Sequence, residues 1–260
     1  MEKQKLHKML AHSGLGSRRA MEDAILSGRV MVNGKPAEVG MRVGPEDMVR
    51  LDGRIVKLKF TDRLPRVMLY HKQEGEIVSR DDPEKRASVF DKLPRMRSSK
   101  WISIGRLDFN TSGLLIFTTS GELANRLTHP GFEVEREYSA RILGRVEPEQ
   151  AKQLLSGIEL DDGVAKFEAF SDEGGEGANH WYRVILKEGR NRIVRRLFES
   201  MGLTVSRLIR TRFGPVSLPP RLKRGMLLEL TEEEVSTLLH WAGIRHEPET
   251  KPARLPRKAR

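Results

Sequence analysis

Residues 105–130 read GRLDFNTSGLLIFTTSGELANRLTHP, and this stretch decides the type of fold. It opens with a polar segment that has a glycine at each end. The hydrophobic run at 114–119 follows and predicts a buried strand. Ser120 comes next and is a suitable N-cap for a helix that continues through Leu127. The stretch therefore predicts a polar loop that leads into a strand and then a helix.

The chain on both sides of this stretch is rich in strand patterns. Strands are predicted at 67–70, 101–104, 137–146, 181–186 and 205–213. One helix is predicted at 191–201, and another follows Thr231, which can form a capping box with Glu234. Because strands outnumber helices and alternate in polarity, we expect an α+β fold with a mainly antiparallel mixed sheet.

The first 60 residues have a different pattern. Residues 5–12 place hydrophobic side chains at helical spacing, and Ser17 can cap a second helix that ends at Gly28. The dipeptides Asn33-Gly34 and Asp52-Gly53 are typical of hairpin turns between short strands. This region is therefore predicted to form two short helices followed by a small sheet.

Arg18 and Arg19 open the second helix on its solvent side. Together with the free N–H groups of the first turn, their guanidinium groups suit an RNA phosphate. The alternative is that both are ordinary solvated arginines.

Positive charge is concentrated at the two ends of the chain. The formal net charge is +11; residues 1–60 hold 12 basic and 7 acidic residues, and residues 250–260 hold five basic and no acidic ones. The remainder is nearly neutral, with 30 basic and 29 acidic residues. This segregation predicts a polyanionic partner such as RNA. We expect a small domain at 1–60, a linker at 61–65, a larger domain at 66–246 and a basic, disordered tail at 247–260.

Several classes of protein are disfavoured by what the sequence lacks. It has no cysteine, no apolar run of membrane-spanning length and no hydrophobic segment near its N-terminus like that of a signal peptide. Its seven histidines show no metal-binding spacing, and its paired glycines at 174–175 lie outside a strand-glycine-helix context. We therefore expect a soluble, cytoplasmic protein that needs neither a metal nor a cofactor.

Asp108 is the first candidate for chemistry. It lies in the glycine-bounded loop between two hydrophobic strands, and its neighbour Arg106 favours the ionised carboxylate. The alternative is a structural cap, which is the more common role of a single aspartate in a turn.

A second cluster is basic. Residues 190–212 contain seven arginines and one acidic residue, Glu199. Arg195 falls at the edge of the apolar helix face, where it can reach inward to a carboxylate. The others predict contacts to RNA phosphates or bases, and those we expect to bind RNA are Arg190, Arg192, Arg196 and Arg210. The alternative is a solvated charged face.

The stretch LHKMLAHSGLGSRRAMEDAILSGRVMVNGKPAEVG resembles the S4 RNA-binding domain in its spacing of Leu6, Ser17-Arg18, Gly28 and the following Val-x-Val-Asn-Gly. In that family the two helices face the RNA. The resemblance therefore agrees with the placement of Arg18 and Arg19 described above.

The stretch quoted first, with EREYSARILGRV and EGRNRIVRRLFESMGLTVSRLIRTRFGP, resembles the RsuA/RluB branch of pseudouridine synthases in order and spacing. Within that branch it is most similar to members that act on large-subunit ribosomal RNA. The resemblance implies an isomerase that converts one uridine of that RNA to pseudouridine, and we expect it to act as a monomer. It places the motif aspartate on Asp108, the tyrosine on Tyr138 and the arginine on Arg195.

The reaction also requires the target base to leave its stack, which is costly unless another group fills the gap. Spacing and family analogy together assign this role to Arg106. Two other functions remain open from the residues alone, because S4 domains also occur on RNA methyltransferases and on non-catalytic assembly factors.

Overall fold

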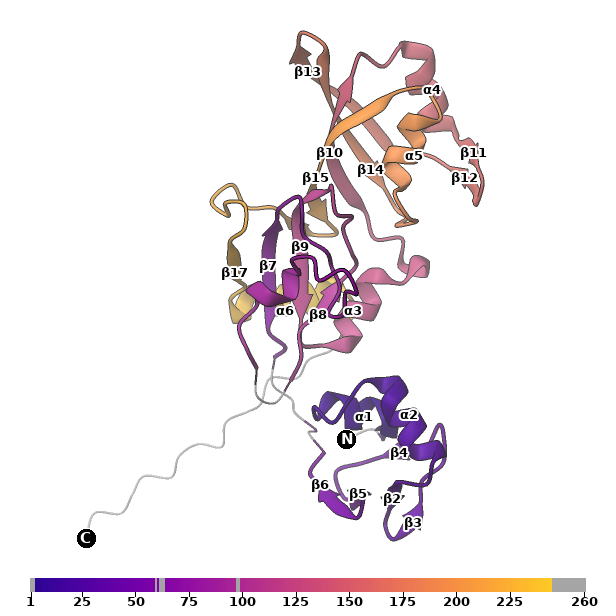
Figure 1. Cartoon of the computed structure of the whole chain (residues 1–260), viewed down its shortest axis with the longest axis vertical. Coiled ribbons are helices and arrows are strands. Elements are labelled where there is room, and N and C mark those ends of the chain that lie inside the picture. The colour runs from indigo at the N-terminus through magenta and orange to yellow at the C-terminus, as the bar shows by residue number, and fades with distance from the viewer. Residues whose placement is uncertain (1–2, 59, 61–63, 97–98, 245–260) are drawn as a thin grey trace, which may run out of the picture. The chain divides into compact units, whose positions relative to one another are not determined.

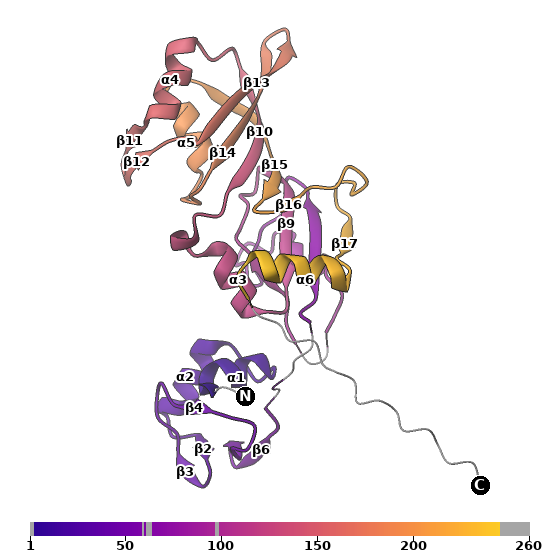
Figure 2. The ribbon, with the colours of Figure 1, turned by 180° about the vertical axis from the view of Figure 1, so that it is seen from behind.

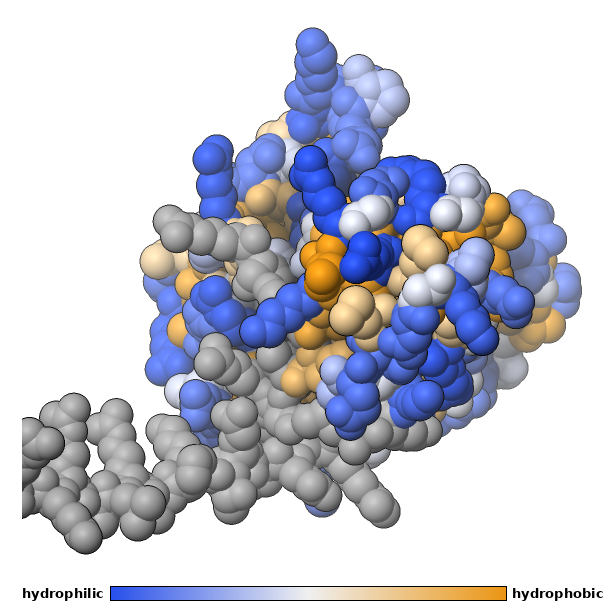
Figure 3. Space-filling view, turned by 90° about the horizontal axis from the view of Figure 1, so that it is seen from below, coloured by the Kyte–Doolittle hydropathy of each residue, from blue (hydrophilic) through white to orange (hydrophobic). Residues whose placement is uncertain are grey.

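The computed structural model describes residues 3–58, 60, 64–96 and 99–244. The predicted tail at 247–260 and most of the predicted linker at 61–65 lie outside these described residues. The chain divides into two compact units, one formed mainly by residues up to Arg63 and one by Leu64–Leu93 with Trp101–His246. Figure 3 shows a mostly hydrophilic surface with small hydrophobic patches between the polar side chains.

The first unit packs two helices on small sheets, as predicted. The Ser17 hydroxyl accepts a hydrogen bond of 3.0 Å from Ala20 N and so caps the second helix. Asn33 and Asp52 both have positive φ, as the two-residue hairpin turns that they form with Gly34 and Gly53 require. The elements are β1 Gln4–Lys5, α1 Leu6–His12, α2 Arg18–Leu26, β2 Val30–Val32, β3 Lys35–Pro36, β4 Arg42–Val43, β5 Val49–Leu51 and β6 Arg54–Val56.

The second unit is built on one nine-stranded sheet, whose main path has the order β13-β14-β10-β15-β9-β7-β17. Strands β15 and β9 pair in parallel, and the other described pairs of this sheet are antiparallel. This confirms the predicted α+β class with a mainly antiparallel mixed sheet. Its strands are β7 Val67–Lys72, β8 Ile102–Ile104, β9 Ser112–Thr118, β10 Arg136–Leu143, β13 Ala169–Glu176, β14 Asn179–Leu186, β15 Thr204–Phe213, β16 Val216–Ser217 and β17 Leu227–Glu229.

Two separate groups of helices cover the two halves of this sheet (Figures 1 and 2). Side chains of α3 and α6 pack with those of β7 and β9 in one core. Side chains of α4 and α5 pack with those of β10, β14 and β15 in a second core. The remaining elements are η1 Val89–Lys92, α3 Gly121–Thr128, η2 Pro130–Phe132, α4 Pro148–Ser156, β11 Ile158–Leu160, β12 Gly163–Ala165, α5 Ile193–Glu199 and α6 Glu232–Trp241.

The predicted helix at 191–201 is shorter in the structure. Arg192 adopts a left-handed conformation with φ 49°, so that regular helix geometry begins only at Ile193. The predicted capping box of the last helix is present, with Thr231 and Glu234 each bonded to the backbone of the other.

Candidate active site

Asp108 lies on the loop of residues 105–111 between β8 and β9, which we call the Asp108 loop. Thr111 N donates to Asp108 O over 3.1 Å and closes a tight turn. Leu107 is buried, whereas Arg106 is exposed and Asp108 is partly exposed. The buried leucine thus anchors a loop from which Arg106 and Asp108 reach the surface.

Lys72, at the end of β7, was not anticipated from the sequence as part of this site. It is fully buried, and its ammonium group donates to the carbonyl oxygens of Asp108 at 3.0 Å and Thr111 at 2.9 Å. A third bond of 2.9 Å goes to the carbonyl of Gln73, the next residue. One side chain therefore fixes both ends of the turn that carries the carboxylate.

Burial lowers the pKa of Lys72 to about 8, although attraction to Glu76, Asp108 and Glu74 opposes the shift. The ordinary value is 10.5, so the unfolded chain holds more protons than the folded chain between pH 8 and 10.5. The contribution of Lys72 to the free energy of unfolding is therefore least favourable below pH 8 and rises through this window.

We expect the free energy of unfolding of the native chain to increase relative to that of Lys72→Met between pH 8 and 10.5, by at most about 3 kcal/mol. Urea unfolding at a series of pH values measures this difference. The exposed Lys152 provides the control, because Lys152→Met removes a lysine without changing a buried charge. Parallel pH curves for the native chain and Lys72→Met would contradict the assignment.

Arg195, on α5, also holds the Asp108 loop. It is buried and donates to Asn110 O at 2.8 Å and to Val205 O at 2.7 Å. Burial lowers its pKa, with Arg192 contributing, while attraction to Asp108 raises it. Arg195 thus reaches inward as predicted, but in the described part of the chain its guanidinium bonds to carbonyl oxygens, and no ion pair joins it to Asp108.

Tyr138 and the loop are connected through the register of three strands. Tyr138 on β10 lies opposite Arg210 on β15, and Arg210 lies opposite Gly113 on β9. Two strand spacings correspond to about 10 Å between Tyr138 and Gly113. Tyr138 is partly buried and packs against the core under α5. The fold therefore brings an aromatic ring, a carboxylate and two buried cations to one region.

Arg210 lies inside the protein, which differs from the RNA-contacting surface position expected from the sequence. It is 2% exposed, and its Nε donates to Leu114 O at 2.8 Å. Its guanidinium lies 4.9 Å from the centre of the Phe213 ring. Burial lowers its pKa, and interaction with Tyr138 opposes that shift. Arg210 thus holds β15 to β9 beneath Tyr138.

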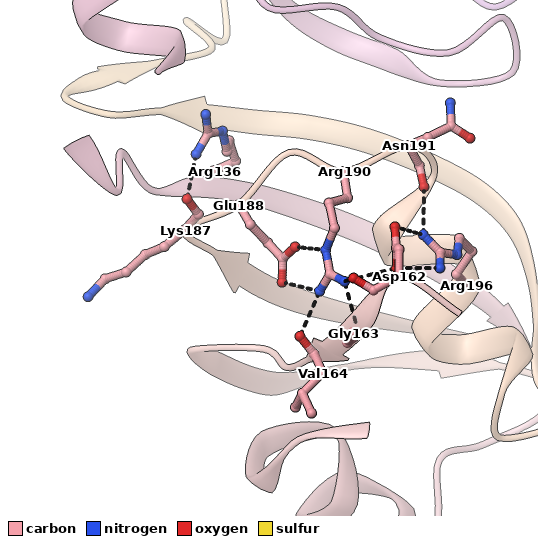
Figure 4. A network of polar contacts seen from close by, with 9 residues as sticks. All are labelled: Arg136, Asp162, Gly163, Val164, Lys187, Glu188, Arg190, Asn191 and Arg196. Carbon is pink, nitrogen blue, oxygen red and sulfur yellow. Dashed lines mark hydrogen bonds and ion pairs between the residues drawn. The ribbon is translucent and has the colours of Figure 1, made fainter. Parts of the chain in front are cut away.

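Arg190 and Arg196 also bind protein groups where RNA contacts were expected (Figure 4). Arg190 pairs with Glu188 and with Asp162, and it donates to the carbonyls of Gly163 at 2.9 Å and Val164 at 2.8 Å. Arg196 pairs with Asp162 at 2.6 Å. Because Asp162 and the two carbonyls belong to the β11–β12 hairpin, these arginines fasten that hairpin to the start of α5.

The other arginines predicted to bind RNA are placed where they can do so. Arg18 and Arg19 are exposed on the first turn of α2, and Arg106 is exposed beside Asp108. Arg192 is also accessible, with its side chain 42% exposed, and makes a 3.4 Å ion pair with Glu199. Their contact with RNA remains a prediction.

Comparison with known proteins identifies the class to which this arrangement belongs. Residues 66–200 match the model of the RNA pseudouridylate synthase family, and residues 4–49 match the S4 domain. The chain belongs to the RNA pseudouridylate synthase family and carries an S4 domain at its N-terminus.

The individual relatives are similar over almost the whole chain. A Pseudomonas aeruginosa protein named ribosomal large subunit pseudouridine synthase B is 49% identical over 97% of this chain. A Haemophilus influenzae protein of the same name is 52% identical over 96% of the chain. The chain spans 64% of the length of the first relative and 71% of the second.

One solved structure supports the fold directly. The crystal structure of a pseudouridylate synthase has 25% sequence identity and a TM-score of 0.62. The similarity covers 90% of this chain and 99% of the other.

Proposed function

We propose that this protein isomerises a specific uridine of large-subunit ribosomal RNA to pseudouridine. The family supports the reaction, and the names of the relatives support large-subunit ribosomal RNA as the substrate. The observation that carries the proposal is the carboxylate of Asp108, which is partly exposed on a loop whose backbone is held by the buried cations of Lys72 and Arg195. We expect the protein to act as a monomer in the cytoplasm.

The chemistry explains why such a site is sufficient. The C1′–N1 glycosidic bond breaks, the base rotates and a C1′–C5 bond forms; the proton lost at C5 is balanced by one gained at N1. The product is an isomer of the substrate, so the balanced reaction requires no oxidant and no donor of a chemical group. The carboxylate of Asp108 acts either as the nucleophile at C1′ or as the base that removes the 2′ proton.

The neighbouring residues have distinct roles in this proposal. Lys72 and Arg195 hold the Asp108 loop by donating hydrogen bonds to its backbone carbonyl groups. Tyr138 packs against the flipped base and assists proton transfer at C5. A loop held through its backbone keeps its carboxylate in position before the substrate binds, which lowers the barrier to reaction.

The test is isomerisation without any added cofactor. Unmodified large-subunit ribosomal RNA is incubated with the full chain, and pseudouridine is mapped by carbodiimide treatment and primer extension. A new stop at one position supports the proposal. A methyl mark that requires S-adenosylmethionine, or binding without modification, would instead support a methyltransferase or an assembly factor.

Arg106 is proposed to fill the space left by the flipped base, because it is exposed two residues before Asp108. We expect Arg106→Ala to lower the rate of pseudouridine formation more on folded RNA than on an unpaired oligonucleotide with the same target. In unpaired RNA the base leaves no stacked gap to fill.

Single-turnover rates on the two substrates measure this difference. Arg145→Ala is the matched control, since Arg145 is an exposed arginine beyond the far end of β10. Equal losses of Arg106→Ala on both substrates would rule out gap filling.

A further inference from the structure

Another concentration of positive charge lies on the connection from β16 to β17, at residues 219–226, which we call the basic loop. Arg221, Lys223 and Arg224 are exposed, and residues 213–228 contain no aspartate or glutamate. No ion pair joins these three cations to a carboxylate within the described residues. Their charge is therefore available to a partner, unlike that of Arg190 and Arg196.

The basic loop has a fixed backbone. Leu222 is buried in the core that also contains residues of α3 and α6. Gly225 N donates to His71 O at 2.8 Å, and His71 N donates to Met226 O at 3.1 Å. The His71 ring nitrogen Nδ1 lies 2.8 Å from Leu222 O and, since a carbonyl only accepts, it must donate. The three cations thus project from a backbone that is held before any ligand binds.

Gly225 explains how the loop fits so closely on β7. Its φ is +77°, and a Cβ atom there would lie 2.0 Å from the side-chain nitrogen of Gln73. Glycine adopts this backbone conformation without strain, and the end of the Gln73 side chain lies against its open face. The loop therefore packs directly on the segment that follows β7.

The same end of β7 supports the Asp108 loop. Lys72 lies between His71 and Gln73, and it binds the Asp108 loop through its ammonium group. The strand register places the end of β7 beside the start of β9 and the start of β17, because Lys72 pairs with Gly113 and Tyr70 pairs with Leu227. The basic loop and the Asp108 loop therefore lie at the same end of these three strands. Two strand spacings separate them, which corresponds to about 10 Å. Figures 1 and 2 show the basic loop at this end of β7 and β17.

We propose that the basic loop binds the phosphate backbone of the RNA a few nucleotides from the target uridine. This inference rests on the proposed function and adds a contact surface on the larger unit. Three exposed cations within four residues, in a stretch of sequence without acidic residues, suit a run of phosphates. A pre-organised loop also avoids the entropic cost of ordering on binding.

The test uses the full chain with all three cations replaced, as Arg221→Gln, Lys223→Gln and Arg224→Gln. Glutamine keeps the side chains polar and extended, and Leu222 and Gly225 are retained, so the backbone bonds are preserved. The control removes three exposed cations elsewhere in the larger unit, as Arg145→Gln, Lys152→Gln and Lys166→Gln. Thermal unfolding establishes that both variants are folded.

Two readouts are made with unmodified large-subunit ribosomal RNA. In steady-state assays, the basic-loop variant is expected to raise KM by roughly tenfold or more, with little change in kcat. In filter binding, the plot of log affinity against log salt concentration is expected to lose about two to three units of slope, one for each phosphate contact removed. The control variant is expected to show neither change.

The results separate this inference from the proposed function. Affinity and salt slope equal to those of the control would overturn the basic-loop assignment while leaving isomerisation intact. If the native chain forms no pseudouridine, the proposed function fails, and filter binding still decides whether the loop binds RNA. The inference would also be overturned if the basic-loop variant kept the native salt slope on RNA but lost binding to an acidic protein. The loop would then bind a protein and not RNA.

Discussion

Asp108→Asn is expected to lower the rate of pseudouridine formation by at least about 10⁴-fold, because the amide is neither a nucleophile nor a base. Asparagine has nearly the same shape as aspartate, and the loop is held through its backbone carbonyls, including that of Asp108 itself. The loop geometry and the affinity for RNA should therefore change little. Single-turnover assays measure the rate, and filter binding measures the affinity.

Two comparisons make this result specific. Asp161→Asn removes an exposed carboxylate of the same unit and is expected to leave the rate unchanged. Asp108→Glu retains the charge but displaces it by one methylene, so we expect a large loss that is smaller than that of Asp108→Asn. If Asp108→Asn kept more than about a tenth of the native rate, the carboxylate would have no direct part in the reaction.

Gly113→Ala is expected to have the largest effect on both stability and rate among substitutions outside the Asp108 loop. Gly113 has φ +105°, and a Cβ atom there would lie 2.3 Å from Arg210 O and 2.5 Å from Arg210 N. Both contacts are to backbone, so β9 and β15 must separate to accept the methyl group. We expect the free energy of unfolding to fall by about 3 kcal/mol or more.

The same displacement should affect catalysis. Gly113 follows the Asp108 loop by two residues, and it lies beside the Arg210 that pairs with Tyr138. A shift of about 1 Å here moves the carboxylate relative to the aromatic ring, and we expect the rate to fall by about 100-fold. Urea unfolding and single-turnover assays at a temperature where the variant is folded measure the two effects separately.

Gly144→Ala provides the matched control for this prediction. Gly144 has a similar φ of +94°, but a Cβ atom there would have no neighbour within 4 Å. Gly144 therefore shares the unfavourable backbone conformation but has no second strand against it. We expect Gly144→Ala to lower the free energy of unfolding by about 1 kcal/mol and to leave the rate unchanged. Equal effects of the two substitutions would show that the close approach of β15 is unimportant.

Much of the local structure could be predicted from the sequence. The cap at Ser17, the turns at Asn33 and Asp52, and the capping box of Thr231 with Glu234 depend on residues close to one another in the chain. Helix α4 was missed, although Pro148 at its first position and Gln150 bonded to the Glu147 backbone are recognisable start signals. Such features depend on residues that lie only a few positions apart in the sequence.

The arginines of 190–212 show where prediction from the sequence ends. Their periodicity indicated which face of the helix is buried, and Arg195 does turn inward. It did not indicate that Arg195 would bind the carbonyl of Asn110, 85 residues away, or that Arg190 and Arg196 would share Asp162. Those partners belong to distant segments, whose positions follow from the packing of the whole unit.

By itself, the sequence determined the family, the α+β class and the position of Asp108, because motif order, hydrophobic periodicity and turn residues are recorded along the chain. Only the tertiary structure decided what holds Asp108 in place. Lys72 is 36 residues away in sequence, and the need for glycine at 113 arises from a strand 97 residues further on. Buried backbone carbonyl groups require hydrogen-bond donors, and two closely packed strands leave no space for a side chain between them. Which residues meet these two requirements depends on the segments that the fold brings together.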